Sequence, residues 1–256
     1  MEYLDYEQVI GMPRNTLLAI AKGEKCPACG SNFLTQMGNC FCHALREWWR
    51  DFATNVPAHD RGISLATIAP SPKSRLSMER QQTVIDEMRA EPEKSYAFFG
   101  PVGTSKTTFG VALYEQALWN SYVNEDWRLR EYNFEKHVWR VSAKYLLDDF
   151  VAYSRHEEID GKPAKLPAIN RQVIGRVARM GNRPCLFLEE IDKVAYSKYK
   201  TDTLFELVDA MYENHGQLVF NTNLTLAEFE AQFHPPSGPA FTRRIGEQAE
   251  IKNFFE

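Results

Sequence analysis

Residues 98–109 read FFGPVGTSKTTF and begin inside a short apolar run, SYAFF. The stretch is close to the phosphate-loop pattern G-x-x-x-x-G-K-[ST], in which a strand ends, backbone amides turn inward and a helix begins. Gly100, Lys106 and Thr107 fit this pattern, whereas Ser105 stands where the pattern has glycine. Because an apolar run precedes the loop and a helical pattern follows it, the stretch predicts a nucleotide site that tolerates the serine.

The chemistry of such a loop assigns a role to each residue type. Backbone N–H groups surround the phosphates, a lysine reaches the β- and γ-phosphates, and a hydroxyl holds Mg²⁺. We therefore expect ATP and Mg²⁺ as cofactors, with Lys106 on the phosphates and Thr107 on the metal side. Ser105 keeps its N–H but adds a side chain near the phosphates, so we expect weaker binding or slower turnover rather than loss of the site.

Two carboxylates, Glu189 and Glu190, directly follow the apolar run PCLFL. A nucleotide hydrolase needs an acid at a strand tip for Mg²⁺ and another acid to orient the attacking water. We expect Glu189 to reach Mg²⁺ through a water, because it is one methylene longer than the usual aspartate, and Glu190 to polarise the attacking water. The residues expected to bind the cofactor are Gly100, Pro101, Gly103, Thr104, Ser105, Lys106, Thr107, Thr108 and Glu189.

Strand and helix patterns alternate along the chain and predict an α/β fold with a mostly parallel sheet of five strands flanked by helices. Continuous apolar runs without polar alternation are typical of strands that are buried on both faces. Ser77 is expected to cap a helix that ends near Ala90. The predicted strands are 95–99, 137–142, 184–188, 217–221 and the segment AEIKNFF, and predicted helices include 107–120, 143–154 and 169–181.

Composition limits the classes of protein. The chain has 256 residues, 44% of them hydrophobic, and a net charge of -4. This length allows one sizeable domain and a small appendage, and the charge requires any DNA contact to use a local patch. No apolar run approaches the ~20 residues of a membrane span, and the acidic N-terminus lacks an apolar signal core. We expect a cytoplasmic protein that does not enter membranes.

Four of the five cysteines form two close pairs, Cys26-x-x-Cys29 and Cys40-x-Cys42. In a reducing compartment such clusters are more often metal ligands than disulfides. Four thiolates suit tetrahedral, structural Zn²⁺, with His43 as an alternative to Cys42 for the fourth ligand. The pairs belong to a predicted N-terminal module at 1–54, followed by a linker at 55–74 and an ATPase domain at 75–256.

The helix after the cysteines carries Leu45, Trp48, Trp49 and Phe52 on one face. These tryptophans have two interpretations, contact with a partner protein or packing against the zinc module. Nucleic-acid binding by this module is less favoured, because acidic residues alternate with the few arginines.

Four motifs in order, GPVGTSKTT, LFLEEID, VFNTNLT and AFTRRI, resemble those of AAA+ ATPases. The most similar branch is that of the DnaC/DnaI helicase loaders, which also includes the IstB-type transposition ATPases, and the resemblance covers about residues 62–254. It implies an AAA+ ATPase in which Glu190 is the catalytic glutamate and Glu189 occupies the Walker B aspartate position. Asn223 matches the sensor-1 asparagine, with Asn221 as second choice, and Arg244 matches the arginine finger, with Arg243 as second choice.

The resemblance also implies partners: a replicative helicase bound through the N-terminal module, single-stranded DNA, and further copies of the chain that each supply an arginine finger. Family members continue to a sensor-2 arginine, whereas this sequence ends at Glu256, so we expect a shortened or missing C-terminal lid. Two alternatives stay open, an IstB-type transposition helper and a slowly hydrolysing or non-hydrolysing nucleotide-regulated adaptor. Four arginines, Arg171, Arg176, Arg179 and Arg183, lie in the stretch INRQVIGRVARMGNR, and Arg176 and Arg179 would share one helix face. This stretch is a candidate DNA contact or an ordinary solvated basic face.

Overall fold

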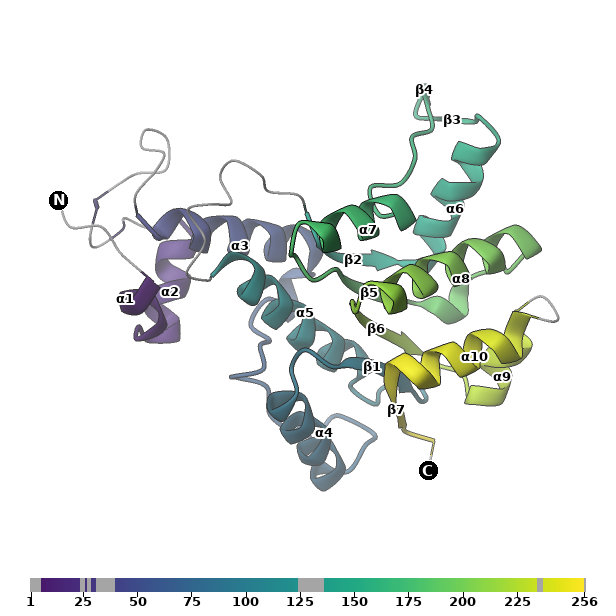
Figure 1. The fold of residues 1–256 in the computed structure, drawn as a ribbon. Coiled ribbons are helices and arrows are strands. Elements are labelled where there is room, and N and C mark those ends of the chain that lie inside the picture. Colours follow the sequence, from purple (N-terminus) through teal and green to yellow (C-terminus); the bar gives the residue numbers. More distant parts are fainter. Residues whose placement is uncertain are drawn as a thin grey trace.

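A computed structural model of the chain describes residues 6–23, 26, 29–30, 40–123, 136–233 and 237–255. At its centre lies a five-stranded sheet in the order β2-β5-β6-β1-β7, in which every neighbouring pair is parallel (Figure 1). The expected fold class, an α/β domain with a five-stranded parallel sheet, is confirmed. Its strands are β1 (Ser95–Phe99), β2 (Val138–Ser142), β5 (Cys185–Glu189), β6 (Gln217–Thr222) and β7 (Ala249–Asn253).

Helices cover both faces of this sheet and divide the core in two (Figure 1). Successive side chains of a strand point to opposite faces, so Tyr96 and Phe98 join one core while Ala97 and Phe99 join the other. This is why the four β1 residues after Ser95 are all buried hydrophobic residues. The helices are α4 (Met78–Ala90) and α5 (Lys106–Tyr122) on the first face, and α6 (Ala143–Ser154), α7 (Arg171–Arg179), α8 (Lys198–Glu213), α9 (Leu226–Ala231) and α10 (Ser237–Gln248) on the second.

Several boundaries follow the sequence patterns closely. β1 coincides with SYAFF, and α4 begins after Ser77, whose hydroxyl accepts a hydrogen bond from the Arg80 amide. α5 begins one residue earlier than predicted and runs two residues further, to Tyr122. α7 is shorter than the predicted 169–181 because Asn170 caps its first turn. A small hairpin, β3 (Glu158–Ile159) and β4 (Lys162–Pro163), follows α6 and was not predicted.

Three N-terminal helices, α1 (Tyr6–Ile10), α2 (Arg14–Ala21) and α3 (Cys42–Asn55), share a core with the sheet. α3 packs along α5, and Trp48 is fully buried there, with its ring 5.2 Å from that of Trp119. The Arg14 guanidinium lies 4.8 Å from the Trp48 ring centroid and pairs with Glu115, a buried carboxylate of α5. Trp48 is therefore a packing residue. The division of the chain at residues 55–74 stays a prediction, and residues 1–5 and 31–39 of the predicted module lie outside the described part.

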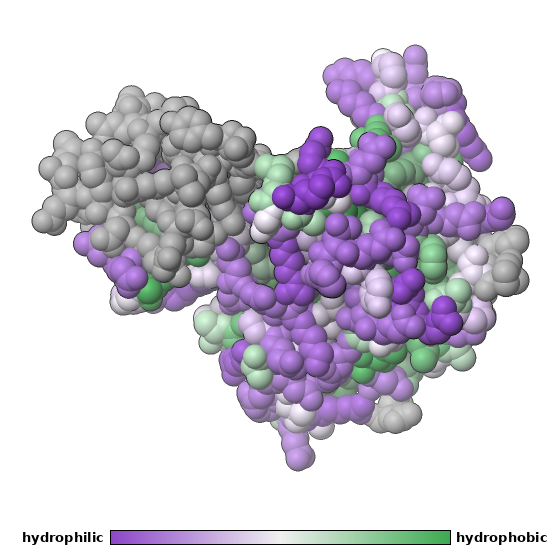
Figure 2. All heavy atoms as spheres, in the orientation of Figure 1, coloured by the Kyte–Doolittle hydropathy of each residue, from purple (hydrophilic) through white to green (hydrophobic). Residues whose placement is uncertain are grey.

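Hydrophilic residues cover most of the described surface in the orientation of Figure 2. The large apolar side chains that are exposed are scattered, and Val102 in the phosphate loop and Tyr145 at the start of α6 are the most open of them. Among the described residues, no helix has both the length and the apolar character that a membrane crossing requires.

Candidate nucleotide site and cysteine cluster

The loop between β1 and α5 contains two glycines that a larger residue would replace only with a clash or with backbone strain. A Cβ on Gly100 would lie 2.6 Å from the Cβ of Phe254, which follows β7. Gly103 has a φ of +88°, a left-handed conformation that glycine adopts without steric cost. The first turn of α5 begins directly after this loop, so its free amides point into the space above it.

Ser105 has a φ of 64°, so its backbone is in the left-handed conformation that Gly103 also adopts. The backbone angle that glycine would take freely is held here by a residue with a Cβ, at a cost of about 1 kcal/mol. The exception in the motif is thus a strained position within an intact loop, because the helix still begins at Lys106.

Lys106 is buried, and its Nζ donates to the carbonyl oxygens of Gly100 at 2.6 Å and Pro101 at 2.8 Å. The Thr104 hydroxyl lies 3.3 Å from the same nitrogen. Burial lowers the pKa of Lys106 to about 8, and the negative charge of Asp192 acts in the opposite direction. The hydrogen-bond partners of this ammonium group are neutral carbonyl and hydroxyl oxygens, so the group is suited to an anionic ligand.

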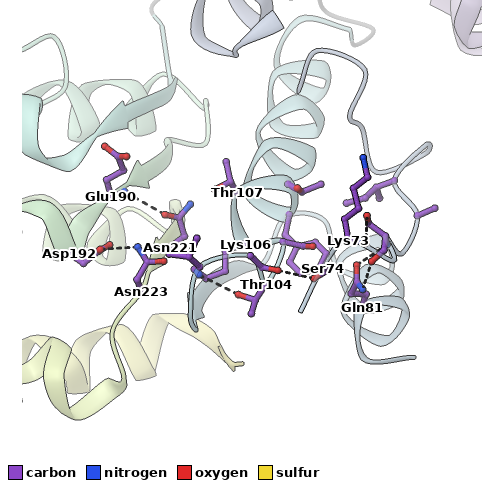
Figure 3. Close-up of a pocket in the computed structure, with 18 of the residues that line it drawn as sticks. Lys73, Ser74, Gln81, Thr104, Lys106, Thr107, Glu190, Asp192, Asn221 and Asn223 are labelled. Carbon is purple, nitrogen blue, oxygen red and sulfur yellow. Dashed lines mark hydrogen bonds between the residues drawn. The ribbon is translucent and has the colours of Figure 1, made fainter. Parts of the chain in front are cut away.

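A pocket of about 540 Å³ opens above this loop, and side chains from five parts of the chain converge on it (Figure 3). Its volume is in the usual range for a small-molecule site. The predicted residues that line it are Gly103, Thr104, Ser105, Lys106, Thr107, Thr108, Glu190, Asn221 and Asn223. Gly100 and Pro101 contribute their carbonyls to Lys106 instead of lining the pocket.

Glu190 begins the short 3₁₀ helix η3 (Ile191–Lys193) with a φ of 55°, and its side chain pairs with Lys193. Its backbone amide is 3.4 Å from the Asn221 side-chain oxygen, which ties the tip of β5 to β6 (Figure 3). Glu190 thus lies at the pocket on a strained backbone, the setting in which functional residues are often held.

Glu189 is placed differently from the expectation. It is not among the residues that line the pocket, and its carboxylate pairs with the buried guanidinium of Arg140 in β2. Burial raises the pKa of Glu189, and the charge of Arg140 opposes this effect. A role of Glu189 as a metal-side ligand stays a prediction, and in this conformation its charge is already compensated.

Asp192 is a pocket residue that the sequence reasoning did not single out. One of its oxygens accepts a hydrogen bond of 3.0 Å from Asn223, while the other, Oδ1, is buried without a hydrogen-bond partner. A buried unpaired carboxylate oxygen is costly and requires a water, an ion or a ligand group as its partner. The signal was present in the quoted LFLEEID, two residues after Glu190.

The predicted linker supplies one wall of the pocket, through Ile68, Ala69, Ser71, Lys73 and Ser74. The amide of Arg75 donates to the Gly103 carbonyl at 2.8 Å, which attaches this segment to the phosphate loop. The buried side chain of Gln81 bonds the backbone of Ser71 in both directions. The sequence did not indicate that segment 68–74 lines the pocket, because a polar segment with prolines is also typical of a linker.

Arg244 is not among the residues that line this pocket. Within the chain, however, it pairs with Asp209 at 3.0 Å and with Glu247 at 3.2 Å, and it lies over the Tyr212 ring. Arg243 is far more open, with 79% of its side chain exposed against 27% for Arg244. The assignment of the arginine finger stays a prediction, and exposure favours the second choice.

Two of the four arginines in the basic stretch form exposed ion pairs within the chain. Arg171 pairs with Glu213 at 2.9 Å, and Arg183 pairs with Glu93 at 3.1 Å. These intramolecular pairs favour the interpretation of an ordinary solvated face, although DNA contact by α7 stays a prediction.

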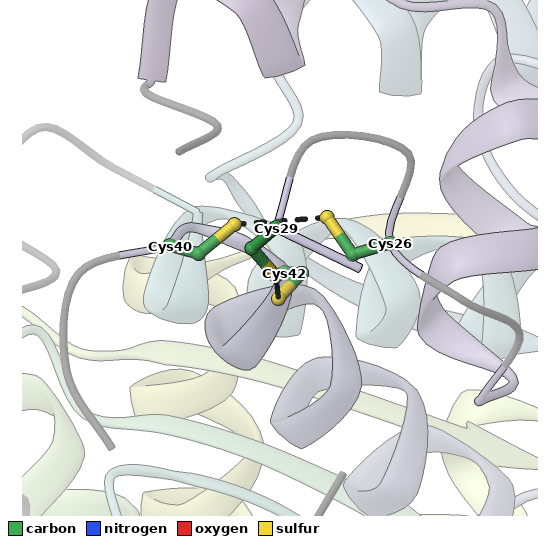
Figure 4. Close-up of side chains that lie close together, drawn as sticks. All are labelled: Cys26, Cys29, Cys40 and Cys42. Carbon is green, nitrogen blue, oxygen red and sulfur yellow. Dashed lines mark hydrogen bonds between the residues drawn. The ribbon is translucent and has the colours of Figure 1, made fainter. Parts of the chain in front are cut away.

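The four cysteines of the two pairs converge in space, and all of their Sγ atoms lie within 4.8 Å of one another (Figure 4). Two Sγ–Sγ distances, Cys26–Cys40 and Cys29–Cys42, are 3.7 Å. A tetrahedron with Zn–S bonds of about 2.3 Å has edges of about 3.8 Å, so the cluster fits Zn²⁺. His43 is not part of this group.

Burial and the neighbouring thiols raise the pKa of Cys42. Four buried thiolates repel one another unless a cation compensates them, and all four cysteines here are buried and free of disulfides. The donor set is therefore that of a closed structural zinc site, with no position left open for catalysis.

Strand order and the polar pocket above the β1–α5 loop together define an α/β domain with a five-stranded parallel sheet and a candidate phosphate-binding loop. No family model and no curated protein matches the sequence.

Solved structures that are similar include a DnaC helicase loader, with 18% identity, 76% of this chain and 98% of that chain covered, and a TM-score of 0.49. For a DnaI structure the values are 13% identity, 78% and 92% coverage, and 0.45. For AMPPCP-bound DnaA from Aquifex aeolicus they are 13% identity, 78% and 51% coverage, and 0.48.

Proposed function

We propose that this chain is an AAA+ ATPase that binds ATP with Mg²⁺ in the pocket above the β1–α5 loop. The proposal rests on the buried ammonium of Lys106, the first residue of α5. Its hydrogen-bond partners are neutral carbonyl and hydroxyl oxygens. Glu190 and Asn223 line the same pocket from the ends of β5 and β6. This is the arrangement that phosphoryl transfer to water requires: cationic groups on the phosphates and polar groups on the attacking water.

Each residue then has a defined task. Lys106 leaves the loop carbonyls and binds the β- and γ-phosphates, while the amides of the first turn of α5 bind the remaining phosphate oxygens. Mg²⁺ would neutralise the developing charge on the phosphates, and the exposed Thr107 hydroxyl is the loop's donor for it. Glu190 accepts a proton from the attacking water, and Asn223 orients that water.

The test is a pair of substitutions read by two methods. Lys106→Ala should abolish binding of ATP in a calorimetric titration, because the phosphates lose their only buried cation among the described pocket residues. Glu190→Gln should retain binding and lose phosphate release. Unchanged ATP affinity in Lys106→Ala would refute the site.

For the biological role, we propose an ATP-dependent replicative helicase loader in the initiation of DNA replication. The support is the order of the sequence motifs and the N-terminal cysteine module, which together resemble DnaC/DnaI-type proteins. In this proposal the module contacts the helicase, the ATPase domains assemble with one another, and the assembly engages single-stranded DNA. Light scattering of a mixture with the replicative helicase from the source of this chain, with and without MgATP, tests it. Absence of a complex under every nucleotide condition would refute it.

One group of observations favours a second candidate, a nucleotide-regulated adaptor that hydrolyses ATP slowly or not at all. Ser105 strains the loop, and Glu189 is paired with Arg140 instead of facing the pocket. Steady-state phosphate release with and without single-stranded DNA separates the two. Robust turnover that disappears in Glu190→Gln would exclude the adaptor.

A further inference from the structure

The side chain of Arg140 connects the Glu189 carboxylate to the end of α3. The Arg140 guanidinium pairs through its Nη2 with the Glu189 carboxylate and donates through its Nη1 to the backbone carbonyl of Asn55, the last residue of α3. Only 7% of the Arg140 side chain is exposed. A buried, two-sided arginine of this kind has a fixed geometry that lysine cannot reproduce.

The direction of Glu189 follows from the strand. Cys185 and Phe187 belong to the core beneath α3 and α5, while Leu186 and Leu188 belong to the other core. Because side chains alternate along a strand, Glu189 points to the α3 and α5 face. Helix α5, whose first turn lines the pocket, packs on this face, while the Glu189 carboxylate is engaged by Arg140 and does not line the pocket.

The length of the Glu189 side chain favours the contact with Arg140. Glutamate is one methylene longer than aspartate, and that extra length lets the carboxylate reach Arg140 across the β2–β5 pair. The strand register places Ser142 beside Glu189 and Arg140 beside Phe187, two residues back along both strands. An aspartate would be retracted from Arg140 and closer to the strand tip.

We propose that Arg140 is a positioning residue that holds the carboxylate of Glu189 away from the metal and makes its release depend on the end of α3. This inference rests on the proposed function, because it concerns the metal side of the same nucleotide site. In the conformation described here the Asn55 carbonyl, at the end of α3, and the Glu189 carboxylate together fix the guanidinium of Arg140. Displacement of the end of α3 would remove one of these two acceptors, and the guanidinium would then no longer be held in the geometry that engages Glu189.

Coupling of this kind is reciprocal. A bound metal–nucleotide that attracts Glu189 must loosen the hold of Arg140 on the carbonyl of Asn55. Conversely, a partner that pulls α3 away must strengthen the contribution of Mg²⁺ to nucleotide binding. Helix α3, which begins at Cys42 of the cysteine cluster, is therefore linked to the proposed nucleotide site through the Asn55 carbonyl at its end, the Arg140 guanidinium and the Glu189 carboxylate.

The experiment measures how much Mg²⁺ strengthens binding of a fluorescent, non-hydrolysable ATP analogue, as the ratio of Kd in EDTA to Kd in Mg²⁺. Glu189→Asp should increase this ratio about five- to tenfold over the wild type, a typical size for a coupling between sites. Glu189→Gln breaks the same ion pair but supplies no anionic ligand, so it should not increase the ratio. Equal ratios in Glu189→Asp and Glu189→Gln would overturn the proposal.

A second variant acts from the arginine side. Arg140→Lys keeps the positive charge but cannot bridge both acceptors, so the ratio should rise in this variant and should not rise in Arg140→Lys combined with Glu189→Gln. A purely structural role of Arg140 would alter thermal stability without changing the ratio, and that result counts against the proposal.

Hydrogen exchange supplies a readout that does not depend on affinity. Binding of the Mg²⁺–analogue complex to the wild type should accelerate amide exchange in the last turn of α3, and Glu189→Gln should show no acceleration. If no variant and no wild-type protein binds nucleotide, the proposed function fails together with this inference. If the wild type binds nucleotide and all ratios agree, the inference alone fails.

Discussion

The Nζ of Lys106 lies 2.6 Å from the carbonyl oxygen of Gly100, at the far end of the same loop. This bond closes the phosphate loop on itself and keeps the lysine on neutral acceptors. The loop is thus closed without a ligand, and in the proposed function a bound nucleotide would exchange these carbonyl partners for anionic ones.

The first prediction concerns pH. Burial lowers the pKa of Lys106 to about 8 in the free protein, and bound phosphates must raise it. Nucleotide affinity should therefore be constant below about pH 8 and should fall above it, by about tenfold for each pH unit, since binding then takes up one proton. Calorimetric titrations from pH 7 to 9.5 measure this decrease.

Lys106→Arg is the matched control for the pH dependence, because arginine stays charged over the whole range. The nucleotide affinity of Lys106→Arg can be weaker than that of the wild type at every pH, but it should not begin to fall near pH 8. A wild-type affinity that is independent of pH up to 9.5 would show that Lys106 does not gain a phosphate partner.

The second prediction concerns the strained serine. Ser105→Gly should increase the free energy of unfolding by about 0.5–1 kcal/mol, because glycine relieves the left-handed strain but also gains freedom in the unfolded chain. It should also strengthen nucleotide binding, since the Cβ near the phosphates is removed. Ser105→Ala keeps the Cβ and should gain neither. Urea unfolding compares the three proteins, and a Ser105→Gly variant no more stable than Ser105→Ala would contradict the strain.

The third prediction concerns the cysteine cluster. The purified chain should contain about one zinc ion per molecule, and Cys40→Ser should lose most of it because a closed tetrahedral site needs all four thiolates. Removal of the metal by a chelator should lower the melting temperature, since metal binding contributes directly to folding. Elemental analysis and calorimetry measure both effects.

Cys185 is the internal control for this experiment. It is buried and reduced like the four others but lies in β5, outside the cluster. Cys185→Ala should therefore keep the full zinc content even if it costs some stability. Equal zinc loss in Cys185→Ala and Cys40→Ser would argue against a specific site.

The fourth prediction concerns the contact between the N-terminal helices and α5. Glu115 is buried, and burial raises its pKa while Arg14 opposes the shift. Arg14→Met should cost about 1–3 kcal/mol of unfolding free energy, because it leaves this carboxylate without its charged partner. Adding Glu115→Leu to Arg14→Met should restore part of the loss.

An exposed pair provides the comparison for that double-mutant cycle. Lys144 and Asp148 lie 2.9 Å apart on the surface of α6, and such pairs contribute about 0–1 kcal/mol. A coupling energy for Arg14 and Glu115 no larger than that of this surface pair would show that the N-terminal helices are not held by the buried pair.

The sequence by itself determined the sheet, the loop and the cysteine set, for a local reason. β1, the Ser77 cap and the start of α5 depend on neighbours within a few residues, and such patterns are written directly in the chain. Two-sided burial makes a strand apolar at every position, and a phosphate loop has a characteristic spacing of glycine, lysine and hydroxyl residues.

Only the tertiary structure decided where the side chains at the strand tips point. Glu189 and Glu190 are adjacent in sequence, yet one is paired with Arg140 on β2 and the other lines the pocket. Asp192 and the segment 68–74 enter the site through contacts with Asn223 and Gly103, which are distant in the chain. Ion pairs and hydrogen bonds between distant residues depend on the packing of whole elements, and no local pattern of residues encodes that packing.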